Sequence, residues 1–128
     1  MFEELKENLE NSYAPYSNYK VSCCLATKDG KKYFGVNVEN SSYGGAICAE
    51  RVAITKAISE GEKPFNFKEL HILGSGDALA LPCFICRQTF TEFFDKDVMI
   101  YIYDNKGEYT KYRMSDMCPH PFSLGENK

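Results

Sequence analysis

The chain has 128 residues, of which 44% are hydrophobic and 26% are charged, and its formal net charge is −3. A chain of this length fits one domain that buries roughly two-thirds of the surface exposed by its unfolded form. No stretch approaches the ~20 apolar residues that cross a bilayer, and the acidic start Met-Phe-Glu-Glu does not resemble a signal peptide. We therefore expect a single domain over residues 1–128, in the cytoplasm, with no membrane partner.

The charge balance bears on the class of substrate. There are 15 Lys and Arg residues against 18 Asp and Glu residues, and the basic residues form no run. A protein that grips nucleic acid usually carries a basic patch, because neutralising phosphates supplies most of the affinity. The sequence therefore disfavours nucleic acid as a partner.

Hydrophobic spacing and turn residues predict eight regular elements. Phe2, Leu5, Leu9 and Tyr13 follow helical spacing, and a proline at position 15 ends that pattern. The complete expected order is helix 2–13, strands 19–27 and 31–38, helix 48–60, strand 68–74, helix 82–94, and strands 98–103 and 108–113.

The connections between these elements predict the fold class. Asp104-Asn105-Lys106-Gly107 separates the last two strands, and so short a connection permits only an antiparallel pair. Helices alternate with the earlier strands, as in sheets that carry helices on both faces. We expect a three-layer α/β/α fold with a mixed five-stranded sheet, whose last two strands form an antiparallel hairpin.

Two cysteine-containing segments carry the chemistry, Cys48-Ala49-Glu50-Arg51 and Pro82-Cys83-Phe84-Ile85-Cys86. Alone, the first is typical of a packed thiol, and the second could be a structural zinc site, a redox pair or a chance spacing. Each lies at the predicted start of a helix, where free N–H groups and the helix dipole favour thiolates. Cys83 and Cys86 share one face of the first turn, and Cys48 would supply a third sulfur. Three protein ligands without a fourth describe a catalytic zinc site.

The charged neighbours of these cysteines fit the same site. Glu50 is an acid near the metal that is not needed as a ligand, so it is the natural general base. Zn²⁺ with three thiolates carries a charge of −1, which weakens it as an electrophile. Arg51 and Arg87 are expected to donate to the sulfurs and offset that charge; the alternative is that both are solvated surface residues.

From about Tyr13 to the C-terminus, these residues resemble the cytidine deaminase family of the small, free-nucleoside type. Cys48-Ala49-Glu50 and Pro82-Cys83 to Cys86 match the three-cysteine variant of the zinc-deaminase signature. The resemblance implies the cytidine-deaminase-like fold and one Zn²⁺ per subunit. It also implies hydrolytic deamination of cytidine and deoxycytidine to uridine and deoxyuridine, with release of ammonia, in pyrimidine salvage. Glu50 would then carry a proton to N3 of cytosine and another to the departing amine.

The same resemblance implies the substrate-binding residues. Val36-Asn37-Val38-Glu39-Asn40 is similar to the family's ribose-binding stretch, which implies that Asn37 and Glu39 bind the 3′-hydroxyl. Tyr19 stands where the family usually has a Phe that packs against the pyrimidine, and Ala49 is carried over as a substrate contact.

Two further aromatic residues imply an assembly. Tyr43 and Phe122 match positions that, in tetrameric members of the family, enter the active site of a neighbouring subunit. The resemblance therefore implies a homotetramer. One departure from the family is Phe84, which replaces the usual Gly and is expected to alter packing near the metal.

Other functions remain open. The same architecture could deaminate an aminonucleoside antibiotic such as blasticidin S, or bases in nucleic acid. A non-catalytic zinc module would need a fourth ligand, for which Cys118 and His120 are the candidates. We expect Cys118 to be a spare hydrophobic thiol, like Cys23 and Cys24, and His71 to be a structural histidine.

Overall fold

Five strands form one mixed sheet in the computed structural model, which describes residues 1–125. The order across the sheet is β2-β1-β3-β4-β5, and β3 and β4 are parallel while the other neighbours are antiparallel. This confirms the predicted mixed sheet and its C-terminal hairpin. The strands are β1 (Val21–Thr27), β2 (Lys32–Val36), β3 (Phe67–Gly74), β4 (Met99–Tyr103) and β5 (Tyr109–Arg113).

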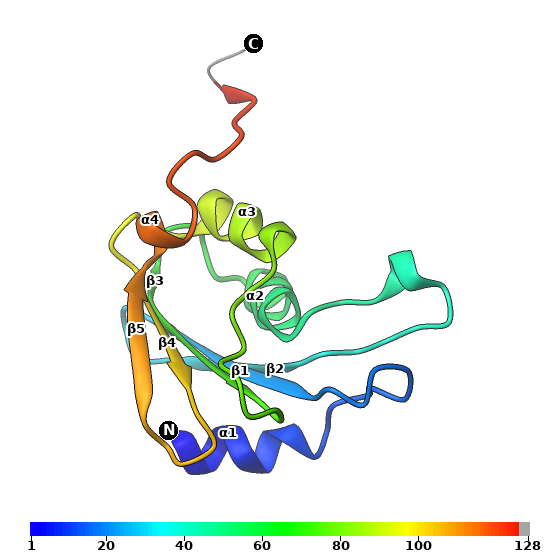
Figure 1. The fold of residues 1–128 in the computed structure, drawn as a ribbon. Coiled ribbons are helices and arrows are strands. Elements are labelled where there is room, and N and C mark those ends of the chain that lie inside the picture. Colours follow the sequence, from blue (N-terminus) through cyan, green and yellow to red (C-terminus); the bar gives the residue numbers. More distant parts are fainter. Residues whose placement is uncertain (126–128) are drawn as a thin grey trace.

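Helices cover both faces of this sheet (Figure 1). Helix α1 (Phe2–Leu9) lies on one face, while α2 (Ala49–Ser59), α3 (Phe84–Phe93) and the short α4 (Met114–Met117) lie on the other. The predicted three-layer α/β/α fold is therefore confirmed. Within residues 1–125, no helix combines the length and the apolar character that crossing a membrane requires.

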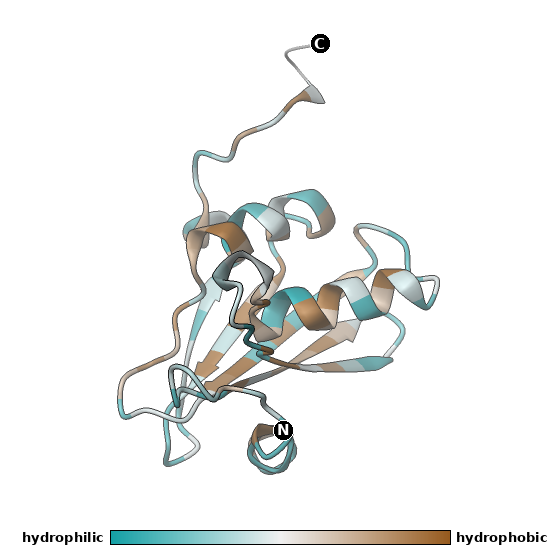
Figure 2. Cartoon of the chain, turned by 90° about the vertical axis from the view of Figure 1, so that its right-hand side faces the viewer, coloured by the Kyte–Doolittle hydropathy of each residue, from teal (hydrophilic) through white to brown (hydrophobic). Residues whose placement is uncertain are grey.

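The two faces of the sheet have separate hydrophobic cores. In Figure 2 the hydrophobic parts of the strands lie between α1 and the remaining helices. Successive side chains of a strand point to opposite faces, so Cys23 packs with the larger core under α2 and α3 while Cys24 packs under α1. Both thiols are buried, as expected for spare hydrophobic cysteines. The core under α1 consists of Leu5, Cys24, Leu73 and Tyr103.

Two helix boundaries differ from the prediction by two residues or more. The first helix ends at Leu9 rather than residue 13, because the Tyr13 N–H donates to the Asn37 carbonyl instead of continuing the helix. The helix expected from Pro82 begins at Phe84, because Cys83 has an extended N-cap conformation with φ −68° and ψ 166°. The short 3₁₀ helix η1 (Tyr43–Gly45) and α4 were not predicted.

Helix α2 lies unusually close to the sheet at Gly35 of β2. A Cβ atom on Gly35 would lie 2.4 Å from the Ala49 carbonyl oxygen and 2.7 Å from the Ala53 nitrogen. The Cys23 thiol on β1 donates to the same Ala49 carbonyl at 3.0 Å. Strands β1 and β2 thus fix the first turn of α2, which carries Glu50.

Candidate metal centre and active site

Three cysteine sulfurs meet where the N-terminal ends of α2 and α3 come together. Cys48 is the N-cap residue of α2, Cys83 is the N-cap residue of α3, and Cys86 lies in the first turn of α3. The three Sγ atoms lie within 4.8 Å of one another, and the Cys48 and Cys83 sulfurs are 3.7 Å apart. The cluster predicted from the two motifs is therefore present.

The donor set of this cluster fits zinc. Sulfur ligands, two of them three residues apart, suit Zn²⁺. Hydrogen bonds from Cys86, Arg51 and Cys83 hold the pKa of Cys48 well below the usual range of a thiol, which favours its thiolate form. Among residues 1–125, neither Cys118 nor His120 belongs to the cluster. The fourth protein ligand that a closed structural site requires is thus not found among the described residues.

The two arginines behave differently. The Arg51 Nη2 donates to the Cys48 sulfur at 3.7 Å, as expected for a residue that offsets thiolate charge. Arg87 instead donates from Nε to the Pro82 carbonyl at 2.7 Å and from Nη1 to the Met117 carbonyl at 3.3 Å. Within residues 1–125, the hydrogen bonds of Arg87 join backbone segments and none reaches a sulfur. The charge-offsetting role expected for Arg87 therefore stays a prediction.

Phe84 also takes a place that the sequence did not indicate. Its side chain is 74% exposed, and the Arg87 guanidinium carbon lies 4.5 Å from the ring centroid. The ring therefore points outward from the start of α3 and is stabilised by a cation–π contact. Its bulk does not crowd the three sulfurs.

Glu50 lies in the first turn of α2 and is only 4% exposed. Burial, together with the negative charge of Cys48, raises the pKa of this carboxyl to about 7. Loss of hydration disfavours the charged form of an acid, so Glu50 can hold or release a proton near neutral pH.

A cavity of about 480 Å³ adjoins Glu50 and the cluster. It brings together most of the residues singled out from the sequence, although they come from four separate segments. The cavity walls include Tyr19, Asn37, Glu39, Cys48, Ala49, Glu50 and Cys83.

The polar groups of Asn37 are largely occupied within the protein. Its Oδ1 accepts from the Val21 N–H at 2.9 Å and from the Ser12 hydroxyl. Its Nδ2 donates to the Tyr19 carbonyl at 2.8 Å. An amide oxygen accepts two hydrogen bonds and an NH₂ group donates two. One N–H of Asn37 therefore remains to bind a ligand.

The Glu39 carboxylate is held by hydrogen bonds from the segment around Ser17. Its Oε1 accepts from the Tyr16 and Ser17 N–H groups at 2.9 and 3.1 Å, and its Oε2 accepts from the Ser17 hydroxyl. The Ser17 hydroxyl lowers the pKa of Glu39, so this carboxyl is ionised at neutral pH. Oε2 keeps acceptor capacity that can serve a ligand.

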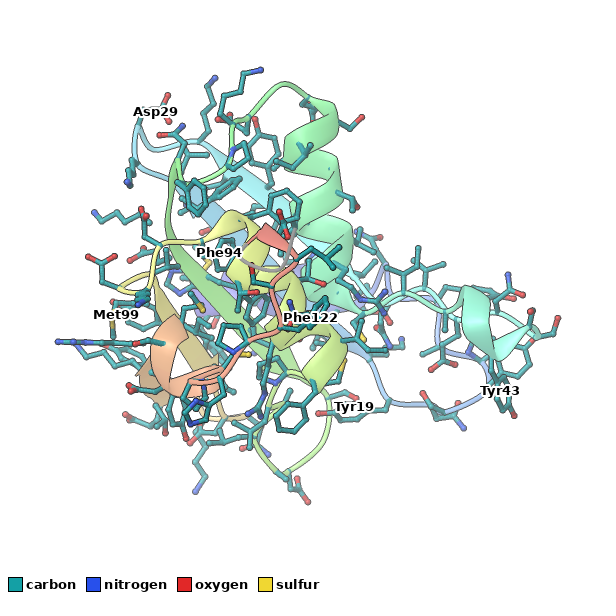
Figure 3. All side chains as sticks on the ribbon, turned by 90° about the horizontal axis from the view of Figure 1, so that it is seen from above. Tyr19, Asp29, Tyr43, Phe94, Met99 and Phe122 are labelled. Carbon is teal, nitrogen blue, oxygen red and sulfur yellow. The ribbon has the colours of Figure 1, made fainter. Side chains whose placement is uncertain are left out.

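Tyr43 and Phe122 are exposed aromatic residues that are not part of the wall of this cavity. Tyr43 is 81% exposed at the outer end of a loop that projects from the molecule, well apart from Tyr19 (Figure 3). Phe122 is 64% exposed, and its backbone N–H and carbonyl bind the Gln88 side chain at 3.1 and 2.8 Å. Neither aromatic ring lines this cavity in the isolated chain.

Sequence reasoning missed part of the cavity wall. Leu79, Ala80 and Leu81 line it, and their apolar run directly before Pro82 was the available signal. Ser12 and Ser17, which hold Asn37 and Glu39, carried no comparable signal because their partners are distant in the sequence.

Comparison with known proteins identifies the family. Residues 1–102 match the family model described as the cytidine and deoxycytidylate deaminase zinc-binding region. A cytidine deaminase from Sporosarcina psychrophila is 35% identical over 123 residues, which cover 96% of this chain and 89% of that relative. The crystal structure of cytidine deaminase from Burkholderia pseudomallei superposes with a TM-score of 0.89 at 37% identity, covering 94% of each chain. The chain belongs to the cytidine deaminase family.

Proposed function

We propose that this chain is a zinc-dependent hydrolase that converts cytidine and deoxycytidine to uridine and deoxyuridine with release of ammonia. The observation that carries the proposal is that one cavity joins the sulfur cluster, the buried Glu50 and the Asn37–Glu39 pair. Relatives that match nearly the whole chain are cytidine deaminases.

Cys48, Cys83 and Cys86 would hold the metal, with Arg51 offsetting the charge of the sulfurs. Bound Zn²⁺ supplies Lewis acidity and makes water a stronger nucleophile at neutral pH. Two helix N-termini direct their dipoles at these sulfurs, which favours the thiolate forms that bind metal.

Glu50 would move the protons of the reaction. Its buried carboxyl has a pKa of about 7, which suits a group that both accepts and donates protons at neutral pH. It would accept one proton from water and pass it to N3 of the cytosine ring. It would then take the second proton from the hydroxyl added at C4, which becomes a carbonyl, and deliver that proton to the departing amine.

Asn37 and Glu39 would bind one hydroxyl of the sugar. Asn37 has one free N–H and Glu39 has a free acceptor position, so together they match a hydroxyl that accepts one hydrogen bond and donates another. Ribose and deoxyribose both carry the 3′-hydroxyl, which explains why both nucleosides would be substrates. Tyr19 and Ala49, which line the same cavity, would contact the base.

We also propose a homotetramer in which Tyr43 and Phe122 complete the active sites of neighbouring subunits. Both rings are exposed on the isolated chain. Burying aromatic side chains against a partner chain would stabilise the assembly. Light scattering of the active enzyme should give the mass of four chains. An active monomer would refute the shared site.

The cysteines bear on the compartment in which the protein works. All six cysteines are free, which is typical of a reducing compartment. We propose that residues 1–128 act as a single-domain cytoplasmic enzyme of pyrimidine salvage.

The test is an ultraviolet assay for loss of the cytosine chromophore, with zinc analysis of the same sample. The substrates are cytidine, deoxycytidine, their monophosphates and blasticidin S. We expect rapid conversion of both free nucleosides and one zinc ion per subunit. Zinc binding without conversion of either nucleoside would contradict the proposal, and preferential conversion of blasticidin S would favour an antibiotic deaminase.

A further inference from the structure

Tyr19, in the wall of the cavity, packs closely against Gly74, which has no side chain to obstruct it. A Cβ atom on Gly74 would lie 2.4 Å from the Tyr19 hydroxyl oxygen and 3.0 Å from Cζ of the same ring. A Cβ atom on Gly76 would lie 3.1 Å from the Cε1 atom of Tyr19. The ring therefore rests on two glycines at the end of β3, and its hydroxyl occupies the space that a side chain at position 74 would take.

The requirement for glycine at position 74 is steric. Gly74 is the last residue of β3 and pairs with Val21 of β1, and it is not among the residues with positive φ. Any amino acid could adopt its backbone conformation. What excludes a side chain is the proximity of Tyr19 on one side and of the Ala80 Cβ, at 2.8 Å, on the other.

Both neighbours of Gly74 belong to the cavity that contains Glu50. Tyr19 and Ala80 line it, as do Leu79 and Leu81. A methyl group at position 74 must push the Tyr19 ring, the Ala80 segment or both, because atoms in a packed interior do not approach so closely. Gly74 itself lies behind this wall and is not one of the lining residues.

We propose that Gly74 is a positioning residue for Tyr19 and that the two form a matched pair. Gly74 leaves the space that the tyrosine hydroxyl needs, and so fixes where the aromatic ring meets the base of the substrate. The inference rests on the proposed deaminase function. It adds the residue that sets the position of the aromatic wall, and it accounts for a tyrosine at position 19.

The test is a double-mutant cycle with Gly74→Ala, Tyr19→Phe and the double variant, measured with cytidine. Gly74→Ala should raise KM about tenfold and change kcat less, because even a small displacement of a positioning group is costly. Tyr19→Phe removes the atom nearest to the added methyl group. The double variant should therefore recover part of the loss, with a KM clearly below that of Gly74→Ala, because the clash with the Tyr19 hydroxyl is gone while the contact with the Ala80 Cβ remains.

Gly125→Ala is the matched control, since its nearest neighbour would be the Ser123 Oγ at an ordinary 3.5 Å; its KM should equal that of the unchanged chain. A double variant no better than Gly74→Ala would overturn the inference. If Gly74→Ala does not fold, the double variant must still fold and bind zinc, and its failure to do so would equally overturn it.

The cycle also separates this inference from the proposed function. If the unchanged chain converts neither nucleoside, the proposed function fails. The coupling between positions 19 and 74 is then read from thermal unfolding midpoints, where the double variant should lose less than the sum of the single losses. Additive losses there would overturn the matched pair.

Discussion

At the scale of single residues, the substrate groups depend on neighbours that hold them in place. The Ser17 hydroxyl and N–H both bind the Glu39 carboxylate, and the Tyr19 N–H donates to the Ser17 oxygen at 3.0 Å. Ser17 therefore links the group proposed to bind the sugar to the aromatic ring proposed to contact the base. This preorganisation should appear in binding of the substrate more than in the chemical step.

Ser17→Ala removes one hydrogen bond to a charged acceptor, which is typically worth about 1.5–3 kcal/mol. We expect KM to rise roughly tenfold for cytidine and for deoxycytidine, because both share the 3′-hydroxyl, with little change in kcat. Steady-state kinetics measure this effect, with Ser59→Ala at the exposed far end of α2 as the control. A selective loss for one nucleoside would contradict the role proposed for Glu39.

The different contacts of Arg51 and Arg87 predict different effects when each positive charge is removed. Arg51 donates to the Cys48 sulfur, whereas Arg87 donates to two backbone carbonyls. Removing a residue that supports a metal ligand typically costs about 10–100-fold in activity or metal affinity. We expect Arg51→Gln to show such a loss in kcat/KM or zinc retention, and Arg87→Gln to lose less of both. Equal losses would show that Arg87 also acts on the metal.

At the scale of elements, the close packing of α2 on the sheet sets the positions of Cys48 and Glu50. Gly35 leaves no room for a side chain below Ala49 and Ala53, so Gly35→Ala must lift the first turn of α2. Overpacking of this kind costs about 1–3 kcal/mol, and it should also lower zinc content because Cys48 precedes that turn. Urea unfolding and metal analysis measure both effects, relative to Gly125→Ala. Normal stability with full zinc content would contradict this packing role.

Strand β3 carries the buried His71, whose side chain contacts residues of β3 and β4. Its Nδ1 lies 2.8 Å from the Tyr103 hydroxyl, its Nε2 lies 3.1 Å from Glu69, and its ring stacks on Tyr101 at 4.7 Å. These contacts confirm a structural histidine. Burial lowers its pKa, with the Met1 ammonium and Lys32 adding to the effect and Glu69 opposing it.

This pKa shift makes stability depend on pH. The unfolded chain binds a proton at the ordinary pKa of about 6.5, and the folded chain binds it at a lower pH. Protons therefore favour the unfolded state, so the free energy of unfolding should fall as pH drops below about 6.5. His71→Gln should reduce this fall between pH 7 and pH 5 in urea titrations. An unchanged or steeper pH dependence in the variant would show that other groups cause it.

At the scale of the whole molecule, short sequence patterns were enough to predict the features that depend only on neighbouring residues. All five strands, the hairpin and the sulfur cluster were predictable, because strand alternation and cysteines at helix starts are encoded within short segments. The direction of Arg87 was not, since it depends on the Met117 carbonyl, 30 residues away. The early end of the first helix likewise depends on a backbone bond from Tyr13 to Asn37.

The most direct test of the account is the rate of cytidine conversion by Glu50→Gln, with zinc measured in the same preparation. The variant keeps the size of the side chain and the three sulfurs but removes the carboxyl that would move protons. General acid–base catalysis contributes about 10²–10⁴-fold, so we predict a loss of at least ~100-fold with one zinc ion still bound per subunit. Near-normal conversion with zinc in place would contradict the central claim.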